Sequence, residues 1–273
     1  MPTSRSRHLA ASTLGAIVGL ALVAACGGSS DDSTPSRTSA AAQSEPGPGG
    51  LPADVLDLSS WKLTLPVGSG DDEDEAEEIK QPDLATFSDD RFFTTTSDGS
   101  GVIFRAPAGG ATTSGSEYPR SELREMEPGG DSEASWSNAS GIHVMTVKQA
   151  ITKVPPSKAE VVAGQIHDDE DDVVMVRLEK KRLFVEADGD EIGTLDDGYD
   201  LGTIFTIEVK ATSDGIDVHY ASAKGEGAKT VHYDQVGQGY YFKVGCYTQS
   251  NSSHDDDGAL GEVVVYALDV EHS

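Results

Sequence analysis

Short runs in which apolar and polar residues alternate follow one another along most of the chain. Such runs are typical of β-strands with one buried face. Turn sequences separate them, and Ser97-Asp98-Gly99 and Ser213-Asp214-Gly215 predict two hairpins. The predicted strands span residues 61–65, 92–96, 101–105, 121–127, 143–154, 160–167, 173–179, 182–187, 205–211, 216–221, 240–249 and 262–271.

No convincing amphipathic helix pattern, long apolar span or tandem repeat interrupts this series of strands. Many short strands joined by Gly- and Asp-rich turns favour two antiparallel sheets packed face to face. We therefore expect one all-β domain over residues 52–273, a β-jelly roll sandwich with a concave binding face. Pro66 is expected to end the first strand, and the acidic run 71–78 is expected to be a solvated loop.

Residues 240–249, Tyr-Tyr-Phe-Lys-Val-Gly-Cys-Tyr-Thr-Gln, predict a strand whose two faces differ in kind. Alternation puts Phe242, Val244 and Cys246 on one face, which suits a buried core. The opposite face carries a cation, two phenols and an amide, with a glycine that leaves space: Tyr241, Lys243, Gly245, Tyr247 and Gln249. That polar face is predicted to bind a ligand.

Two further predicted strands carry polar rows of the same kind. Alternation places Arg120, Glu122 and Arg124 on one face, and it places Gln165 and His167 together on another. Taken singly, the charged row is more typical of a cross-strand salt-bridge ladder, and His167 of a solvated loop histidine. Three such rows in one protein predict a shared cleft for a polar ligand.

The formal net charge of −27 limits the partners that the chain can have. Nucleic acid and anionic lipid surfaces are bound by clustered Lys and Arg, so neither is expected as a partner. A locally basic cleft can still hold an anionic ligand. The acidic runs 168–172 and 255–257 are read as solubilising loops. Calcium binding is the alternative for such carboxylates, although 168–172 lacks the spaced glycine of an EF-hand loop.

Residues 1–25 have the pattern of a signal peptide, with a positively charged start and an apolar run too short for a comfortable membrane span. The run ends in Val-Ala-Ala-Cys, which resembles a bacterial lipobox and predicts lipidation of Cys26. Residues 26–51, rich in Ser, Gly and Pro, are expected to be a flexible linker. The chain is thus expected to be exported and lipid-anchored at the cell envelope or surface, an ordinary secretory signal being the alternative. With Cys26 lipidated, Cys246 has no disulfide partner within the chain and is expected to be a small buried hydrophobe.

Three motifs give the chain a specific resemblance. Arg-Ser-Glu-Leu-Arg, Gln-Ile-His and Tyr-Phe-Lys-Val-Gly-Cys-Tyr-Thr-Gln resemble, in this order, the signature motifs of the alginate lyases of polysaccharide lyase family seven. The similarity extends from about Leu58 to the end of the chain. It implies a jelly roll whose concave sheet binds a uronic acid polymer, which is cleaved by β-elimination. It places Arg120, Gln165, His167 and Tyr247 on catalytic positions, and Glu122, Arg124, Lys243 and Gln249, with Tyr241 on the same face, on substrate-binding positions.

The chemistry of this elimination fits the side chains. The C5 proton of a 4-linked uronate is weakly acidic beside its carboxylate, on which charge accumulates when the proton leaves. Arg120 and Gln165 can neutralise that charge. His167 suits the base, because its pKa lies near neutrality, and the Tyr247 hydroxyl can protonate the glycosidic oxygen. No metal or other cofactor is required, because the cation already stabilises the charge.

We therefore expect a monomeric alginate lyase, with guluronate-containing stretches favoured because Ile166 occupies the middle motif. A lyase of another polyuronate such as glucuronan is one alternative. A non-catalytic carbohydrate-binding module is the other, but such a module has no use for both His167 and Tyr247. The acids of 168–172 would repel a polyanion unless they point away or are screened, so activity is expected to rise with moderate salt.

Overall fold

The structure, a computed structural model, describes residues 49–70, 72–225 and 227–273. The predicted signal peptide, Cys26 and nearly all of the predicted linker lie outside the described residues. The helices in the described part are two short 3-10 turns, η1 (Pro52–Asp54) and η2 (Asp83–Thr86). No helix among the described residues is long and apolar enough to cross a membrane.

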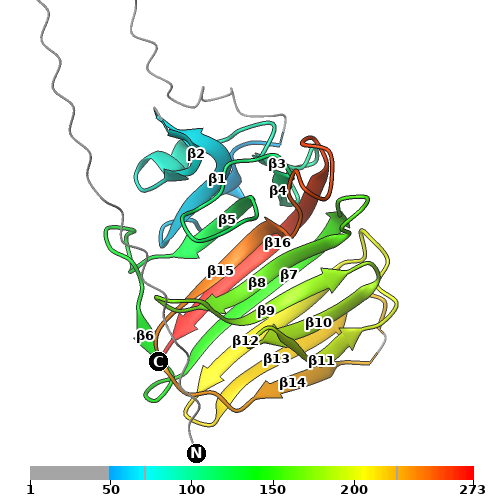
Figure 1. Ribbon diagram of the computed structural model, residues 1–273. Coiled ribbons are helices and arrows are strands. Elements are labelled where there is room, and N and C mark those ends of the chain that lie inside the picture. The colour runs from blue at the N-terminus through cyan, green and yellow to red at the C-terminus, as the bar shows by residue number, and fades with distance from the viewer. Residues whose placement is uncertain (1–48, 71, 226) are drawn as a thin grey trace, which may run out of the picture. The chain divides into compact units, whose positions relative to one another are not determined.

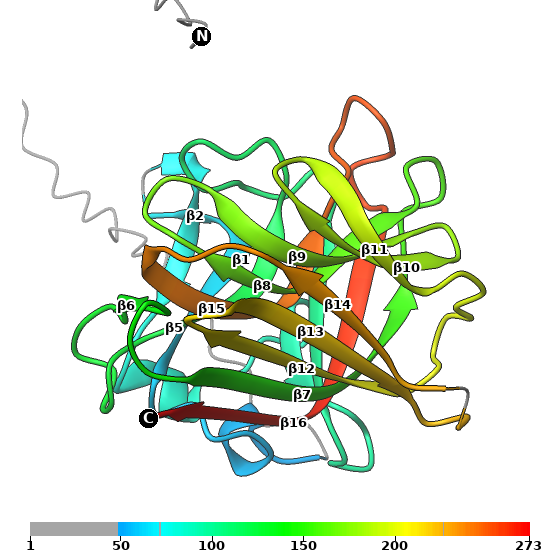
Figure 2. The same ribbon diagram turned by 90° about the horizontal axis from the view of Figure 1, so that it is seen from below.

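Two antiparallel sheets make up the folded part, which confirms the expected all-β jelly-roll sandwich (Figures 1 and 2). The first sheet contains, in spatial order, β11 (Asp190–Asp196), β10 (Arg182–Ala187), β9 (Asp172–Glu179), β8 (Glu160–His167), β15 (Gln238–Thr248), β5 (Arg120–Glu125), β1 (Trp61–Ser69) and β2 (Asp72–Ile79), with β6 (Trp136–Ser137) paired to β15. The second contains β14 (Lys229–Tyr233), β13 (Gly215–Ser222), β12 (Phe205–Thr212), β7 (His143–Lys153), β16 (Leu260–His272), β4 (Val102–Pro107) and β3 (Phe93–Thr95). Both predicted hairpins are present, as β3–β4 and β12–β13.

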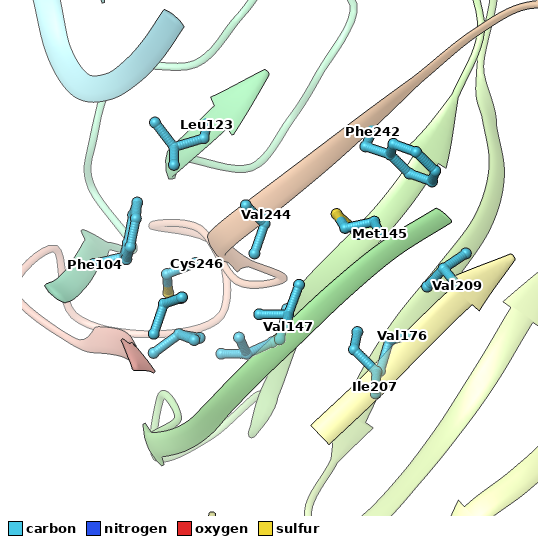
Figure 3. Packing of buried hydrophobic residues seen from close by; sticks show 14 of the residues in the cluster. Phe104, Leu123, Met145, Val147, Val176, Ile207, Val209, Phe242, Val244 and Cys246 are labelled. Atoms are coloured by element: carbon cyan, nitrogen blue, oxygen red, sulfur yellow. The ribbon is translucent and has the colours of Figure 1, made fainter. Parts of the chain in front are cut away.

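The core lies between the sheets, and β15 shows how alternation builds it. Phe242, Val244 and Cys246 are fully buried and point toward the second sheet, where β7 and β12 supply the opposing apolar side chains (Figure 3). Burial raises the pKa of the Cys246 thiol to about 12, so this cysteine stays protonated and inert. The prediction that Cys246 is a small buried hydrophobe is confirmed.

Two predictions about the first strand and the run that follows it were wrong. β1 continues through Pro66 to Ser69, and its pairing with β2 shifts register between Thr64 and Gly68. Proline is tolerated at such irregularities because no ladder hydrogen bond is lost there. The acidic run is the strand β2, which lies at the end of the first sheet. An edge strand has one row of backbone groups in water, so acidic residues suit it better than an apolar alternation.

Strands β11 and β14 carry no clear alternating signal, and the sequence did not predict them. They lie at one end of the first and second sheets, respectively. Their residues are mostly half-buried or exposed, so little apolar patterning is required of them. Pairing with the preceding strands β10 and β13 therefore defines these strands.

Candidate active site

A cleft of about 410 Å³ lies on the outer face of the first sheet, over β1, β5, β15 and β8. Strand register places Lys62, Arg124, Lys243 and Gln165 side by side in one cross-strand row. The three predicted polar rows therefore share one surface. The lining also includes Thr64, Glu78, Thr113, Ser114, Gly115, Ser116, Arg120, Glu133, His167, Asp169, Glu170, Asp171, Asp172, Tyr241 and Tyr247.

An irregularity in β8 turns Gln165 and His167 toward the cleft. Between Val162 and Gln165, β8 has one residue more than its partner β9, so the register shifts there. Ala163 belongs to the core, and a Cβ on Gly164 would lie 3.1 Å from Ile207 of the opposite sheet. Two successive residues thus face inward, and the alternation resumes with the opposite phase. Bulges often re-aim side chains beside active sites in this way.

Glu122 lies beneath the floor of the cleft and holds the catalytic candidates in place. Its side chain is 1% exposed, and its carboxylate lies 2.7 Å from Lys243 Nζ and 3.3 Å from Arg120 Nη1. Gln165 Nε2 donates to its other oxygen. This placement does not favour the predicted contact of Glu122 with substrate, since the carboxylate is nearly inaccessible and contacts three side chains of the protein. Glu122 instead fixes the amide orientation of Gln165, because a carboxylate accepts only from the NH₂ group.

At this centre one carboxylate, Glu122, is paired with two cations. Burial would raise the pKa of Glu122, but Lys243 and Arg120 hold it below its ordinary value, so the carboxylate remains ionised. Burial lowers the pKa of Lys243 to about 8, against the opposing attraction of Glu122. Arg120 Nε is buried and has no hydrogen-bond partner among the described residues. The Arg120 guanidinium lines the cleft, where it can pair with a substrate carboxylate.

His167 is held in the form that a general base requires. Its Nδ1 lies 2.6 Å from the carbonyl oxygen of Asp168, which can only accept, so Nδ1 carries the proton. The other nitrogen, Nε2, is then free to take one. Burial, followed by the positive charge of Lys243, lowers the pKa of His167 below its ordinary value of 6.5. The imidazole is therefore neutral at neutral pH.

Ser116 connects Tyr247 to Arg120, and no pattern in the sequence indicated this contact. Ser116 Oγ lies 3.0 Å from Tyr247 Oη and accepts a hydrogen bond of 3.0 Å from Arg120 Nη2. The Arg120 guanidinium also lies over the Tyr247 ring, 3.8 Å from its centroid. Ser116 belongs to the loop between β4 and β5, which has no periodic pattern. The phenol and the guanidinium are thus fixed relative to each other.

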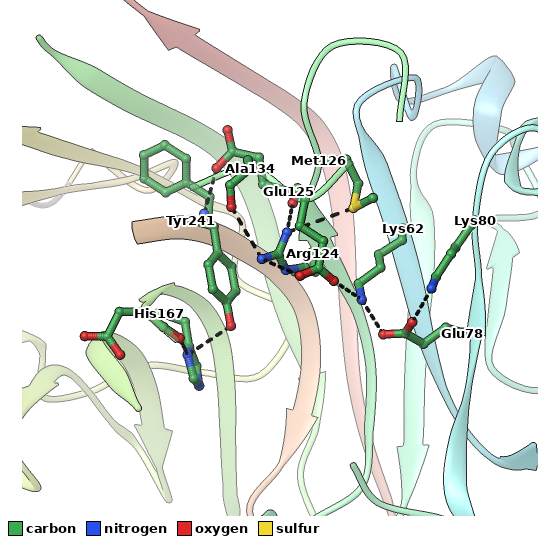
Figure 4. A network of polar contacts seen from close by, with 12 residues as sticks. Lys62, Glu78, Lys80, Arg124, Glu125, Met126, Ala134, His167 and Tyr241 are labelled. Atoms are coloured by element: carbon green, nitrogen blue, oxygen red, sulfur yellow. Dashed lines mark hydrogen bonds and ion pairs between the residues drawn. The ribbon is translucent and has the colours of Figure 1, made fainter. Parts of the chain in front are cut away.

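Arg124, in the cross-strand row of Lys62, Arg124, Lys243 and Gln165, lies over the ring of Tyr241, 3.9 Å from its centroid (Figure 4). Tyr241 in turn stacks on His167, with ring centroids 5.4 Å apart. Lys62 extends the row beyond Arg124 and was not predicted as a site residue. Alternation in Trp61-Lys62-Leu63-Thr64-Leu65 places Lys62 on the face opposite the buried leucines, so the same argument would have found it.

Two other placements differ from expectation. Gln249 follows the end of β15, is 5% exposed and does not belong to the cleft lining, so its predicted contact with substrate is not supported. Acids 169–172 line the cleft rather than pointing away from it. The cleft is therefore lined by these acidic side chains as well as by the cations of the sheet. No group of three or more His, Cys, Asp or Glu side chains in the described residues is arranged to hold a metal ion.

The fold and the cleft together define a class of protein. It is a jelly-roll sandwich whose concave face carries buried cations for an anionic ligand, a neutral histidine and a phenol. The sequence model of the family described as "Alginate lyase" matches residues 56–272. The chain therefore belongs to the alginate lyase family.

Relatives of known structure agree with this assignment. Alginate lyase AlgAT5 from polysaccharide lyase family 7 is 48% identical, with a TM-score of 0.75, over 82% of this chain and 99% of that one. The alginate lyase from Corynebacterium sp. is 40% identical, with a TM-score of 0.74, over 82% and 98%. A substituted family 7 alginate lyase A1-II′, in complex with substrate (GGMG), is 27% identical, with a TM-score of 0.64, over 82% and 97%. An alginate lyase of Klebsiella pneumoniae is 29% identical over 81% of this chain and 91% of the relative.

Proposed function

We propose that this chain cleaves alginate by β-elimination in the cleft over β5, β8 and β15. One observation carries the proposal: a neutral histidine with a free Nε2, a phenol and a guanidinium line the same cleft. A base, a proton donor and a carboxylate-neutralising group are the three functions that the elimination needs. The substrate (GGMG) bound to a family 7 relative supports alginate as the polymer.

The proposed reaction removes one proton from the substrate and returns one to the leaving oxygen. His167 Nε2 removes the C5 proton of the uronate, while Arg120 and the second N–H of Gln165 stabilise the charge that develops on the carboxylate. The electron pair forms the C4–C5 double bond as the C4–O bond breaks. Tyr247 Oη donates its proton to the departing glycosidic oxygen. Tyr247 serves as both base and acid where the epimer presents its C5 proton on the other side.

We propose a preference for guluronate-containing stretches. The support is the analogy with the middle motif of the family, in which this chain has Ile166. Ile166 is fully buried, so it would act by packing behind the Gln165–His167 segment and not by touching substrate. The single experiment is to incubate the purified protein with alginate, polymannuronate, polyguluronate and glucuronan, and to follow the ultraviolet absorbance of unsaturated product. The fastest rise on polymannuronate or on glucuronan would contradict the preference.

Tyr247→Phe tests the assigned acid. Removal of the hydroxyl should lower kcat by about 10²- to 10⁴-fold, the usual contribution of general acid–base catalysis, with substrate binding kept. Tyr266→Phe, on β16 of the second sheet, is the matched control and should be unaffected. An unchanged kcat in Tyr247→Phe would show that another group protonates the leaving oxygen.

We also propose export and lipid anchoring through Cys26, on the support of the signal-like residues 1–25. Cys26→Ser should move the protein from the detergent phase to the aqueous phase in a detergent partition of expressing bacterial cells. Unchanged partition would contradict the anchor.

A further inference from the structure

A carboxylate of the protein itself covers two cations at one edge of the cleft. Glu133 Oε1 lies 2.8 Å from Lys62 Nζ, and Glu133 Oε2 lies 3.3 Å from Arg124 Nη2. Lys62 and Arg124 are cross-strand neighbours on β1 and β5, in the row that continues to Lys243 and Gln165. Glu133 therefore bridges the outer two cations of this row.

Burial makes the two sides of this contact unequal. The side chains of Lys62 and Arg124 are 9% and 10% exposed, whereas that of Glu133 is 57% exposed. The cations are fixed by neighbours that do not depend on Glu133. Lys62 also pairs with Glu78 at 2.5 Å, and Arg124 donates to the carbonyl oxygen of Glu125 at 2.6 Å. The carboxylate is the part that can move into water.

Arg124 has no second carboxylate partner among the described residues. If Glu133 turns away, a buried guanidinium is left that needs an anion. The hydrogen bond from Lys62 lowers the pKa of Glu133, so the group stays charged around neutrality and competes with other carboxylates.

The Glu133 side chain can turn away from the two cations while the backbone stays in place. Glu133 is bridged to Met126, and the loop between them is closed by a 2.7 Å hydrogen bond from the Glu127 N–H to the Ser132 carbonyl oxygen. Only side-chain rotations are needed to release the two cations.

We infer that Glu133 occupies the place of a substrate carboxylate, and that a uronate at this outer edge of the cleft binds by displacing it. This inference rests on the proposed polyuronate substrate. Gln165 lies three strands away from Lys62, about 14 Å at the usual strand spacing. The displaced carboxylate therefore belongs to a sugar away from the reacting one. Glu133 lowers affinity for extended substrates and leaves the bond-breaking step unchanged.

The test measures binding directly. A long guluronate oligosaccharide is titrated by calorimetry into the Tyr247→Phe protein, which should keep the ligand intact, with and without Glu133→Ala or Glu133→Gln. We expect about two- to fivefold tighter binding in both, the size of an exposed ion pair that no longer competes. Glu127→Ala is the matched control, because it removes the same charge from the same loop and makes no ion pair with either cation. It should bind like the parent.

The outcomes separate this inference from the proposed function. Unchanged or weaker binding after Glu133 substitution overturns it, and so does an equal gain in Glu127→Ala or the absence of binding by every variant. If the unsubstituted protein binds the oligosaccharide but eliminates nothing from any uronate, the proposed function fails, while the binding comparison still decides the role of Glu133. In the active protein, the supporting result is a lower KM with unchanged kcat.

Discussion

Glu122 and Glu125 are two carboxylates of the six-residue strand β5, and they face opposite sides of the sheet. Both side chains are nearly inaccessible, at 1% and 4% exposure. Glu122 faces the cleft, where Lys243, Arg120 and Gln165 surround it. Its partners are the groups that the proposed chemistry needs, so its burial positions the active site.

The Glu125 carboxylate forms no ion pair with a Lys or Arg side chain among the described residues. It accepts from Trp136 Nε1 at 3.0 Å and from the Phe242 N–H at 2.8 Å, and it lies 2.6 Å from His272 Nε2. His272 continues to His143, with the two Nδ1 atoms 2.7 Å apart. These groups belong to β6, β15, β16 and β7, so Glu125 joins one sheet to the other.

The difference shows that a buried acid acquires its role from its partners. Glu122 pairs with two cations next to the substrate path. Glu125 satisfies buried donors at the seam between the sheets. We therefore expect substitutions at Glu122 to affect activity and stability together, and substitutions at Glu125 to affect stability alone.

The largest effect is expected for Glu122→Ala. It leaves the Lys243 and Arg120 charges buried without their counter-ion, which should lower the free energy of unfolding by about 3–5 kcal/mol. Misplacement of Gln165 and Arg120 should lower kcat/KM by about 100-fold or more. Denaturant unfolding and steady-state kinetics measure the two effects. If Glu122→Ala lost stability but kept normal activity, Glu122 would be a structural carboxylate like Glu125.

Glu125→Gln should lower the free energy of unfolding by about 1–3 kcal/mol, because the amide cannot accept at both of its ends. The expected kcat/KM of the folded protein is unchanged, since neither Glu125 nor the partners of its carboxylate line the cleft. The same two measurements apply. A fall in kcat without a change in the unfolding midpoint would show that Glu125 contributes to catalysis and not to stability.

The pH dependence of kcat/KM and of stability should report the protonation of His167 in the cleft. The pKa of His167 is lowered below 6.5, so the acidic limb of kcat/KM should lie below pH 6.5. As pH falls through 6.5, the unfolded chain takes up the His167 proton first, and the free energy of unfolding should decrease. His167→Asn should remove that part of the decrease. A limb at or above pH 6.5 would contradict the neutral base.

The smallest effect is expected from salt. The net charge of −27 and the acids 169–172 beside the cleft repel a polyanion at low ionic strength. Moderate salt should therefore raise kcat/KM roughly twofold, because screening acts most on exposed charges. Asp169→Asn with Asp171→Asn should reduce the rise. A flat or falling profile would show that the buried cations of the floor dominate the encounter.

Alternation within single strands was enough to predict the fold class and most of the cleft. It assigned Lys243 and Tyr247 to one face of β15 and Cys246 to the core, because side-chain direction along a strand is a local property. The same argument, extended to Lys62, would have completed the cationic row. The motifs around Arg120, Gln165 and Tyr247 supplied the resemblance to the family.

Only the tertiary structure decided which groups meet. Glu122 and Glu125 look alike in the sequence, and among their partners Gln165 and His272 lie more than 40 residues away. Ser116 and Glu133 lie outside the strands, where no periodicity indicates direction, and the acidic run forms β2 by pairing with β1. The phase of Gln165 depends on a register shift against β9. Local patterns set the face of a side chain, whereas long-range pairing sets its neighbours, and its chemistry depends on those neighbours.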